Sequence, residues 1–468
     1  MSNCFTEYSQ LDLSQINDEI LKQWKSQNTF KKSIELREGN KNFVFYEGPP
    51  SANGLPGIHH VMSRTIKDII CRYKTMQGFQ VHRKAGWDTH GLPVELSVEK
   101  ELGISKEDIG SKISVEDYNK ACRANVMKYT EEWEQLTEKI GYWVDMDKPY
   151  VTYENTYIES VWYLLKKLFE KDLLYKGYTI QPYSPSAGTG LSSHELNQPG
   201  CYKDVKDTTC TAQFKLKFDN SYSWLFDKTS LEIFSLAWTT TPWTLPSNTA
   251  LCVGPNIKYA LIETYNQYTG EPIAVIMAQD RISAYLSKEG ETAPFDSYAT
   301  DDKIIPYRIV AECTGKDIAG LHYEQLLPWV QPQGKAFEII TGDFVATEDG
   351  TGIVHIAPTF GADDAFVAKQ HNISGLYVTD IYGNESPLVN KQGKIYSIDE
   401  LDGDFVEHYV NTDLYTQFGG RYVKNEYDET IDANAPTLDV DIAVELKMSN
   451  RAFKIEKYIH NYPHCWRT

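Results

Sequence analysis

Residues 43–95 read FVFYEGPPSANGLPGIHHVMSRTIKDIICRYKTMQGFQVHRKAGWDTHGLPVE. A short run of β-forming residues at 43–46 is ended by the Gly-Pro-Pro sequence at 48–50. After a loop of small residues, apolar side chains recur at helical spacing and predict an amphipathic helix over 59–76. A second strand is predicted over 80–84. The order of strand, glycine loop, helix and strand predicts one βαβ unit.

Two features of this predicted unit suit a phosphate group. A helix N-terminus carries unpaired N–H groups and a partial positive charge, and small residues before it let a ligand approach the backbone. His59 and His60 lie where the helix is predicted to begin, and imidazoles can donate hydrogen bonds to phosphate oxygens. A tight turn with two surface histidines explains the same pattern, so the pattern alone leaves both interpretations open.

The segments GPPSANGLPGIHH and AGWDTHGLPVE resemble the nucleotide-binding start of class I aminoacyl-tRNA synthetases, and within these the isoleucyl-tRNA synthetases. The segment WDTHGLPVE separates the chain from the leucine and valine enzymes, which the chain resembles more loosely. The family signature is His, any residue, Gly, His, and this chain has Gly57, Ile58, His59 and His60 there. The second histidine carries over as His60. Gly57 replaces the first, and the sequence leaves open whether His59 supplies the missing donor.

The composition suits a soluble protein of roughly three domains. The chain has 468 residues, of which 41% are hydrophobic and 24% charged. Its formal net charge is −19, so any surface for RNA must be a local basic patch. Eight cysteines without regular spacing suit a reducing cytosol. We find no signal peptide and no run of the ~20 apolar residues that span a bilayer, so a cytoplasmic protein without membrane contact is expected.

Four segments are expected along the chain. Residues 1–42 form an entry region with a helix, and residues 43–202 contain the βαβ unit and further helices, among them one over 158–174 that is expected to cover the sheet. Residues 203–422 show short alternating strands separated by turn residues, which predicts a β-rich insert. Residues 423–468 are expected to return towards the first domain.

The resemblance implies a fold class for this arrangement. It is an α/β protein with the first half of a Rossmann-like class I synthetase catalytic domain, into which a large β-rich editing domain is inserted. The second half of the nucleotide fold and a Lys-Met-Ser-Lys-Ser loop are not in the sequence. The chain is therefore expected to be an N-terminal fragment.

Two polar clusters stand out within the expected insert. The first is WTTTPWT at 238–244, and the second is GTGIVHIAPTFGADD at 350–364. Threonines at a strand exit bring several hydroxyl groups to one pocket, although ordinary β-turns explain the same composition, since Thr and Trp are strand formers. The resemblance implies that the clusters form an editing site, whose residues would be Thr239, Thr240, Thr241, Trp243, Thr244, His355 and Asp364.

The resemblance also implies an activity in two parts. Isoleucine attacks the α-phosphate of ATP, which is bound with Mg²⁺, and the isoleucyl group is then transferred to tRNA(Ile). His60 and His59 would be the catalytic groups, and Pro49 and Asp88 would contact the amino acid. The residues implied at ATP and the adenylate are Gly48, Pro49, Pro50, Asn53, Gly57, His59 and His60.

The second part is hydrolysis of valyl-tRNA(Ile) in the insert. One missing methylene is worth only about 1–3 kcal/mol in an apolar pocket, a limit for which isoleucyl-tRNA synthetase rejecting valine is the standard example. A second pocket is therefore needed to remove valine. Two alternatives stay open: a stand-alone deacylase with an inactive nucleotide fold, and a tRNA-binding relative without enzymatic activity.

A bound metal is not expected within the chain itself. Many relatives carry two Cys-x-x-Cys pairs at the ends of the insert, which together suit a tetrahedral zinc site. Here the first pair corresponds to Ser184 and Ala187 and the second to Cys465 and Thr468, so only Cys465 remains. The partners implied are tRNA(Ile), isoleucine and ATP, and a monomer is expected.

Overall fold

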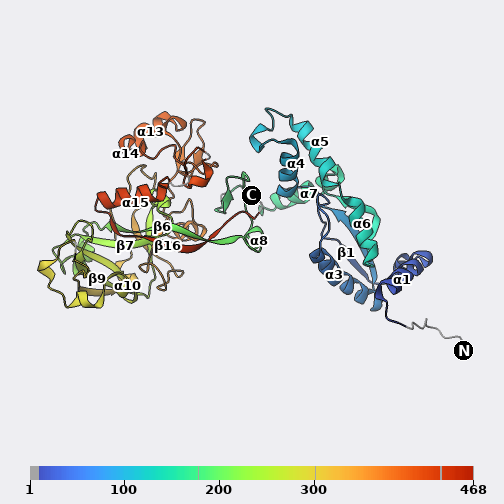
Figure 1. Ribbon diagram of the computed structural model, residues 1–468, viewed down its shortest axis with the longest axis horizontal. Coiled ribbons are helices and arrows are strands. Elements are labelled where there is room, and N and C mark those ends of the chain that lie inside the picture. The colour runs from blue at the N-terminus through green and yellow to red at the C-terminus, as the bar shows by residue number, and fades with distance from the viewer. Residues whose placement is uncertain (1–9, 178, 301, 429, 433–434, 467–468) are drawn as a thin grey trace. The chain divides into compact units, whose positions relative to one another are not determined.

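The computed structural model describes residues 10–466 except 178, 301, 429 and 433–434 (Figure 1). Thr468, which corresponds to one of the zinc-ligand positions of relatives, lies outside the described residues. The chain divides into two compact units, Met1–Gly177 and Tyr178–Thr468. The expected domain boundary at 202/203 lies later in the chain and stays a prediction.

The first unit is built on a three-stranded parallel sheet with the order β1-β2-β3. The predicted strand, helix and strand are present as β1 (Asn42–Tyr46), α3 (Ile58–Met76) and β2 (Gln80–Trp87). The other elements of this unit are β3 (Asp145–Val151), α1 (Leu13–Gln27), α2 (Thr29–Glu35), α4 (Leu92–Leu102), η1 (Lys106–Asp108), α5 (Val115–Val126), α6 (Thr130–Lys139) and α7 (Asn155–Phe169).

The buried side of α3 is polar. Asp68 on this helix accepts from Arg83 on β2 at 3.0 Å, and Arg83 also donates to Thr75 at 3.1 Å. Arg83 is only 2% exposed, and a buried cation needs such partners because an unpaired charge is costly inside a protein. The apolar residues whose spacing predicts the helix are mostly exposed instead; they are Ile58, Met62, Ile66, Ile69, Ile70 and Tyr73.

Helix α7 differs from its expected role. The sequence predicts that this helix covers the sheet, but none of its residues is buried, and Trp162, Leu164 and Phe169 are exposed. The prediction of a covering helix is therefore wrong for the described residues. Helical spacing identifies the apolar side of a helix, but it does not identify the surface that meets this side.

The second unit is rich in β-structure, as the insert is predicted to be. Its main sheet has six strands in the order β11-β9-β10-β7-β6-β16, and a smaller sheet has the order β12-β8-β13. The longer strands are β6 (Tyr202–Lys215), β7 (Ile233–Thr239), β8 (Ala250–Val253), β9 (Lys258–Tyr265), β10 (Pro272–Ala278), β11 (Arg308–Thr314), β12 (Glu338–Thr341), β13 (Ile353–Ile356) and β16 (Ala452–Pro463).

Short elements complete this unit. Two-residue strands pair as β4 (Tyr183–Ser184) with β5 (Thr189–Gly190) and as β14 (Val378–Thr379) with β15 (Glu385–Ser386). The helices are α8 (Ser193–Leu196), η2 (Asn220–Tyr222), α9 (Ser223–Phe226), η3 (Pro242–Ser247), η4 (Gln279–Arg281), α10 (Ile282–Tyr285), η5 (Lys288–Glu291), η6 (Phe295–Ser297), α11 (Gly315–Ile318), α12 (Ala362–Gln370), η7 (Ile398–Glu400), α13 (Gly403–Tyr409), α14 (Thr412–Tyr415), η8 (Asn425–Tyr427) and α15 (Leu438–Met448).

The last strand joins the sheet of the second unit. β16 runs antiparallel to β6, with Tyr458 opposite Asp207, and the two lie side by side in Figure 1 (red and green). Helix α15 also packs in this unit, through the buried residues Leu438, Ile442 and Leu446. The segment 423–468, expected to return to the first domain, thus contributes a helix and an edge strand to the second unit. Pairing between strands this far apart in sequence has no local signal.

Candidate functional site

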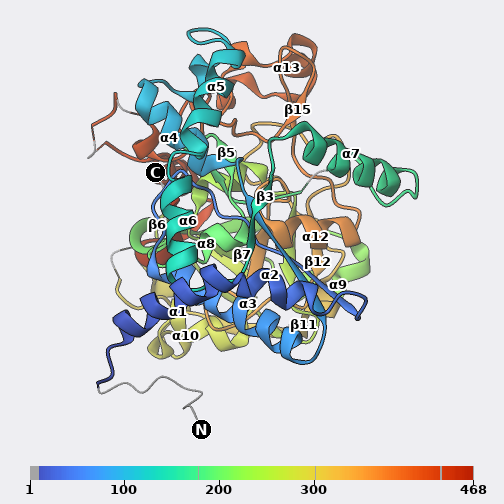
Figure 2. The same cartoon turned by 90° about the vertical axis from the view of Figure 1, so that its right-hand side faces the viewer.

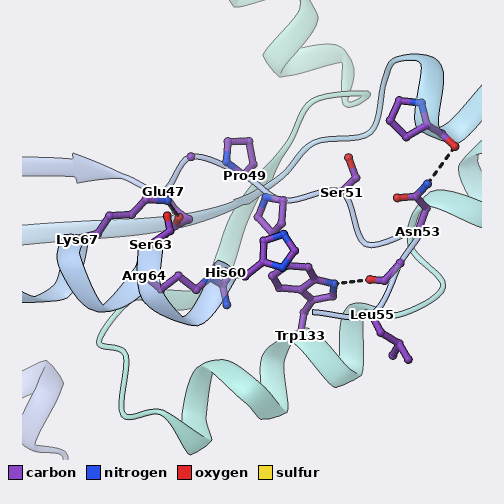
Figure 3. A pocket seen from close by; sticks show the side chains of 14 residues that line it. Glu47, Pro49, Ser51, Asn53, Leu55, His60, Ser63, Arg64, Lys67 and Trp133 are labelled. Carbon is purple, nitrogen blue, oxygen red and sulfur yellow. Dashed lines mark hydrogen bonds and ion pairs between the residues drawn. The ribbon is translucent and has the colours of Figure 1, made fainter. Parts of the chain in front are cut away.

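The first unit contains a pocket of about 440 Å³ between the loop after β1 and the start of α3 (Figure 3). Of the residues expected at a nucleotide, Gly48, Pro49, Pro50, Asn53 and His60 line it. The carboxyl ends of parallel strands are where open α/β sheets bind ligands. Five of the residues expected at a nucleotide thus line one pocket, and their role at a nucleotide stays a prediction.

His60 presents a defined hydrogen-bond donor to the pocket. Its Nδ1 accepts from the backbone N–H of Gly57 at 2.9 Å, so in the neutral ring the proton lies on Nε2. Burial, followed by the nearby charges of His59, Arg64 and Lys67, lowers the pKa of His60. A neutral imidazole with a fixed Nε2–H donor is the consequence. The ring lies edge-on to Trp133, with centroids 4.7 Å apart.

His59 occupies the space of the side chain that Gly57 lacks. A Cβ on Gly57 would lie 2.9 Å from His59 Cε1 and 3.0 Å from its Nδ1. The His59 ring is exposed and contacts the His60 ring, with centroids 3.8 Å apart. His59 and Gly57 do not line the pocket themselves. The structure brings the three signature positions together, with His60 alone facing inwards.

Two cations on α3 also line the pocket, and neither was predicted from the sequence. Arg64 and Lys67 follow His60 by four and seven residues, which places all three on one helix face. Arg64 donates to Thr137 at 2.6 Å and lies 4.9 Å from the centre of the Trp133 ring. The spacing of these residues could have revealed them. Trp133 could not have been found in this way, because it is far away in sequence.

Asp88 and Asn53 lie beside this pocket in different ways. The backbone N–H of Asp88 donates to the carbonyl of Pro50 at 3.0 Å, so the turn after β2 adjoins the loop after β1. The Asp88 carboxylate accepts from the His90 N–H at 3.3 Å and is not among the groups that line the pocket. Asn53 lines the pocket (Figure 3), and its side-chain amide donates to the Pro93 carbonyl at 3.2 Å.

The second unit brings the two polar clusters of the insert together. The threonine segment leaves β7, forms η3 and leads into β8, which pairs with β13. The N–H of Thr241 donates to Thr239 Oγ1 at 3.1 Å, and the Thr244 hydroxyl donates to the Thr241 carbonyl at 2.9 Å. Thr239 and Thr244 are buried, whereas Thr240 is half-buried. The hydroxyl groups therefore fix a tight turn at the strand exit.

His355 on β13 joins this turn. Its Nε2 lies 3.0 Å from Thr244 Oγ1, whose single proton is already donated to Thr241. His355 must therefore donate through Nε2–H, which leaves Nδ1 as the acceptor. Burial lowers the pKa of His355 to about 4, so the ring is neutral near pH 7. Nδ1 is buried and has no hydrogen-bond partner among the described residues.

Asp364 lies in the first turn of α12, which packs on the small sheet β12-β8-β13 (Figure 2). Its Oδ2 accepts from the N–H of Ala357 at 2.8 Å, two residues after His355. Burial raises the pKa of Asp364 to about 6. Trp243 is half-buried and lies edge-on to Phe360, with ring centroids 4.9 Å apart. The predicted residues of this site thus lie on one turn, at the end of one strand and at the start of one helix, and their role in editing stays a prediction.

Among the described residues, no group of three or more His, Cys, Asp or Glu side chains is placed to hold a metal ion. None of the described helices is both long and apolar enough to cross a membrane.

Known proteins resemble this chain along its whole length. An isoleucine–tRNA ligase of Bacteroides fragilis is 59% identical over 468 residues, which is 100% of this chain and 41% of that protein. One of Porphyromonas gingivalis is 59% identical over 469 residues, again 100% of this chain and 41% of that protein. One of Clostridium tetani is 41% identical over 453 residues, or 97% of this chain and 37% of that protein. The chain thus spans about two fifths of the length of these relatives.

The sequence profile of the tRNA synthetases class I (I, L, M and V) matches residues 19–427. That range contains both candidate sites. The chain belongs to the class I tRNA synthetase family.

Proposed function

We propose that this chain is the N-terminal part of an isoleucine–tRNA ligase. The full-length protein would activate isoleucine with ATP to isoleucyl-adenylate and transfer it to tRNA(Ile). The observation that carries this proposal is the 59% identity along the whole chain to ligases of that name. We further propose that the protein acts in the cytoplasm as a monomer, with tRNA(Ile), isoleucine and ATP as its partners.

The first unit would supply the first half of a Rossmann-like catalytic domain. Its parallel strands and the N-terminus of α3 meet at the pocket, a position that suits phosphate groups. His60 Nε2–H, Lys67 and Arg64 would stabilise negative charge as the isoleucine carboxylate attacks the α-phosphate and the bond to the β-phosphate breaks, which releases pyrophosphate. Asp88 and Pro49 would contact the amino acid, with Asp88 holding its ammonium group. The other residues proposed at the nucleotide are Gly48, Pro50, Asn53, Gly57 and His59.

Mg²⁺ would arrive on the phosphates of ATP and not on the protein. Glu47 is the only carboxylate among the residues that line the described pocket, and it is 2% exposed. It already accepts from Lys67 and from the Tyr142 hydroxyl, so its oxygens are engaged. The pocket therefore fits a nucleotide that is bound with its own cation. The absence of a structural zinc stays a prediction.

The second unit would hydrolyse valyl-tRNA(Ile). Thr239, Thr240, Thr241, Trp243 and Thr244 would line the site and position water. His355 would contact the ester end of the substrate. Asp364 would hold the substrate ammonium group.

The activity is tested by amino-acid-dependent ATP–pyrophosphate exchange with the full-length protein. Isoleucine should support exchange better than valine by about 10- to 200-fold, the discrimination that one methylene allows. Leucine and methionine serve as controls. Exchange with none of these amino acids would contradict the proposal, and hydrolysis of valyl-tRNA without any exchange would identify a deacylase instead.

The editing site is tested by Asp364→Asn in the full-length protein. Asparagine has the shape of aspartate and keeps an oxygen for the Ala357 N–H, but it lacks the charge that would hold an ammonium group. Valyl-tRNA(Ile) hydrolysis should fall by about 100-fold, the size of a lost charged contact in an active site. Isoleucine activation should stay unchanged because the two sites lie in separate units.

Asp363→Asn is the matched control, since Asp363 precedes Asp364 on α12 and is exposed. This variant should hydrolyse valyl-tRNA(Ile) at the unchanged rate. An equal loss of activation and hydrolysis in Asp364→Asn would show that the two sites are not separate.

A further inference from the structure

A buried charged cluster contacts the turn at residues 239–244, which we call the threonine turn. Asp439, in the first turn of α15, is 1% exposed. Its Oδ1 accepts from the backbone N–H of Trp243 at 2.9 Å, and its Oδ2 accepts from Lys424 Nζ at 3.3 Å. A backbone N–H in the first turn of a helix has no partner within that helix. Asp439 satisfies this orphan donor of η3.

The cluster continues to the paired strands β6 and β16. Lys424 Nζ also contacts Asp207 Oδ2 at 3.1 Å, and the same oxygen lies 3.1 Å from His460 Nε2. Lys424 lies over the Tyr462 ring as well, with Nζ 5.4 Å from its centre. Burial acts to lower the pKa of Lys424, but Asp439 and Asp207 outweigh it and raise this pKa. Lys424 is therefore charged and holds Asp439 in place.

A chain of direct contacts thus leads from this cluster to the candidate editing site. Asp439 fixes the N–H of Trp243, and the next residue, Thr244, accepts from His355 Nε2. The same Thr244 hydroxyl closes the turn on Thr241. Helix α15, which carries Asp439, lies against β6, β16 and η3 (Figure 1). The position of the turn relative to β13 consequently depends on a carboxylate contributed by the last segment of the chain.

We propose that Asp439, held by Lys424, is a positioning residue for valyl-tRNA hydrolysis, because it anchors the threonine turn at the distance that Thr244 needs to meet His355. The proposal rests on the editing function proposed above. Asp439 does not touch the substrate. Its contribution is to the chemical step, since a turn displaced on the order of 1 Å loses catalysis before it loses binding.

Three variants of the full-length protein test this role. Asp439→Asn keeps an acceptor for the Trp243 N–H, whereas Asp439→Leu removes it at similar volume. Asp439→Leu should lower kcat for valyl-tRNA(Ile) hydrolysis by about 10- to 100-fold and leave KM within about threefold. Asp439→Asn should retain most of the activity. Asp441→Asn is the matched control, because Asp441 lies on the same helix but pairs with Arg421 at the surface.

Hydrogen–deuterium exchange of the peptide that contains 241–248 gives a readout independent of activity. Exchange at the Trp243 N–H should accelerate in Asp439→Leu and stay slow in Asp439→Asn. If Asp439→Leu does not fold, Asp439→Glu tests the positioning role in its place. Glutamate keeps the charge but displaces the carboxylate by one methylene, so this variant should also lower kcat.

The outcomes separate the two proposals. A folded Asp439→Leu or Asp439→Glu protein with unchanged kcat would overturn the positioning role, as would an equal loss in Asp439→Asn and Asp439→Leu. A wild-type protein that does not hydrolyse valyl-tRNA would refute the editing function instead. In that case unchanged exchange at the Trp243 N–H in Asp439→Leu would still refute the anchor.

Discussion

Replacing His60 by alanine in the full-length protein should lower the proposed isoleucine-dependent ATP–pyrophosphate exchange by about 100- to 1000-fold, the usual cost of removing one donor that acts on the transition state. The geometry of His60 supports this size of effect. Its Nδ1 is occupied by the Gly57 N–H, so its Nε2–H is fixed in direction, and it lines the pocket at the N-terminus of α3. The imidazole is neutral near pH 7 because burial and neighbouring cations lower its pKa. A donor that needs no reorganisation stabilises developing charge most effectively.

The loss should appear in kcat and not in the KM for isoleucine, because the proposed contact is to phosphate. His82→Ala is a suitable control, since His82 is exposed on β2 and should leave exchange unchanged. His60→Ala also removes the acceptor for the Gly57 N–H, so the melting temperature should be compared in parallel. Exchange at the wild-type rate in a folded His60→Ala protein would exclude a catalytic role for this residue.

Local patterns predicted the elements that build the first site. The apolar run at 43–46, the small-residue loop and the helical spacing after it correspond to β1, the pocket loop and α3. These signals lie within a few residues of each other, so the sequence carries them directly. The charged residues on the buried side of α3 were not predicted, because a buried Arg83 depends on Asp68 and Thr75 being its neighbours in space.

Long-range contacts limit how much of the second site can be predicted from the sequence. The polar segments at 238–244 and 350–364 stand out in the sequence by composition, but only the family resemblance implied that they form one site. Lys424 and Asp439 were missed. Lys424 meets Asp207 across 217 residues of chain, and the Asp439 contact with Trp243 spans 196 residues. A charged residue in a polar segment looks like solvated surface until the fold shows what encloses it.

The altered signature at residues 57–60 leads to a prediction about pairs of substitutions. The His59 ring lies where a side chain on residue 57 would be, so Gly57 and His59 share one space. His59→Gly should lower ATP–pyrophosphate exchange at least about tenfold if its imidazole replaces the family's first histidine. Gly57→His alone should also lower exchange, because the new side chain displaces the His59 ring. The free energy of unfolding should change little, since His59 is exposed and its ring can move.

The double variant Gly57→His/His59→Gly restores the order His, any residue, Gly, His and should recover exchange to within about threefold of the wild type. The losses of exchange in the two single variants then do not add up in the double variant. This non-additivity measures the energetic coupling between positions 57 and 59. Near-normal exchange in His59→Gly would mean that His59 is a bystander, with His60 as the one histidine that acts. If the double variant is as impaired as the worse single variant, the shared space does not explain the losses. Position 57 then requires glycine itself, whose N–H donates to His60 Nδ1 at the start of α3.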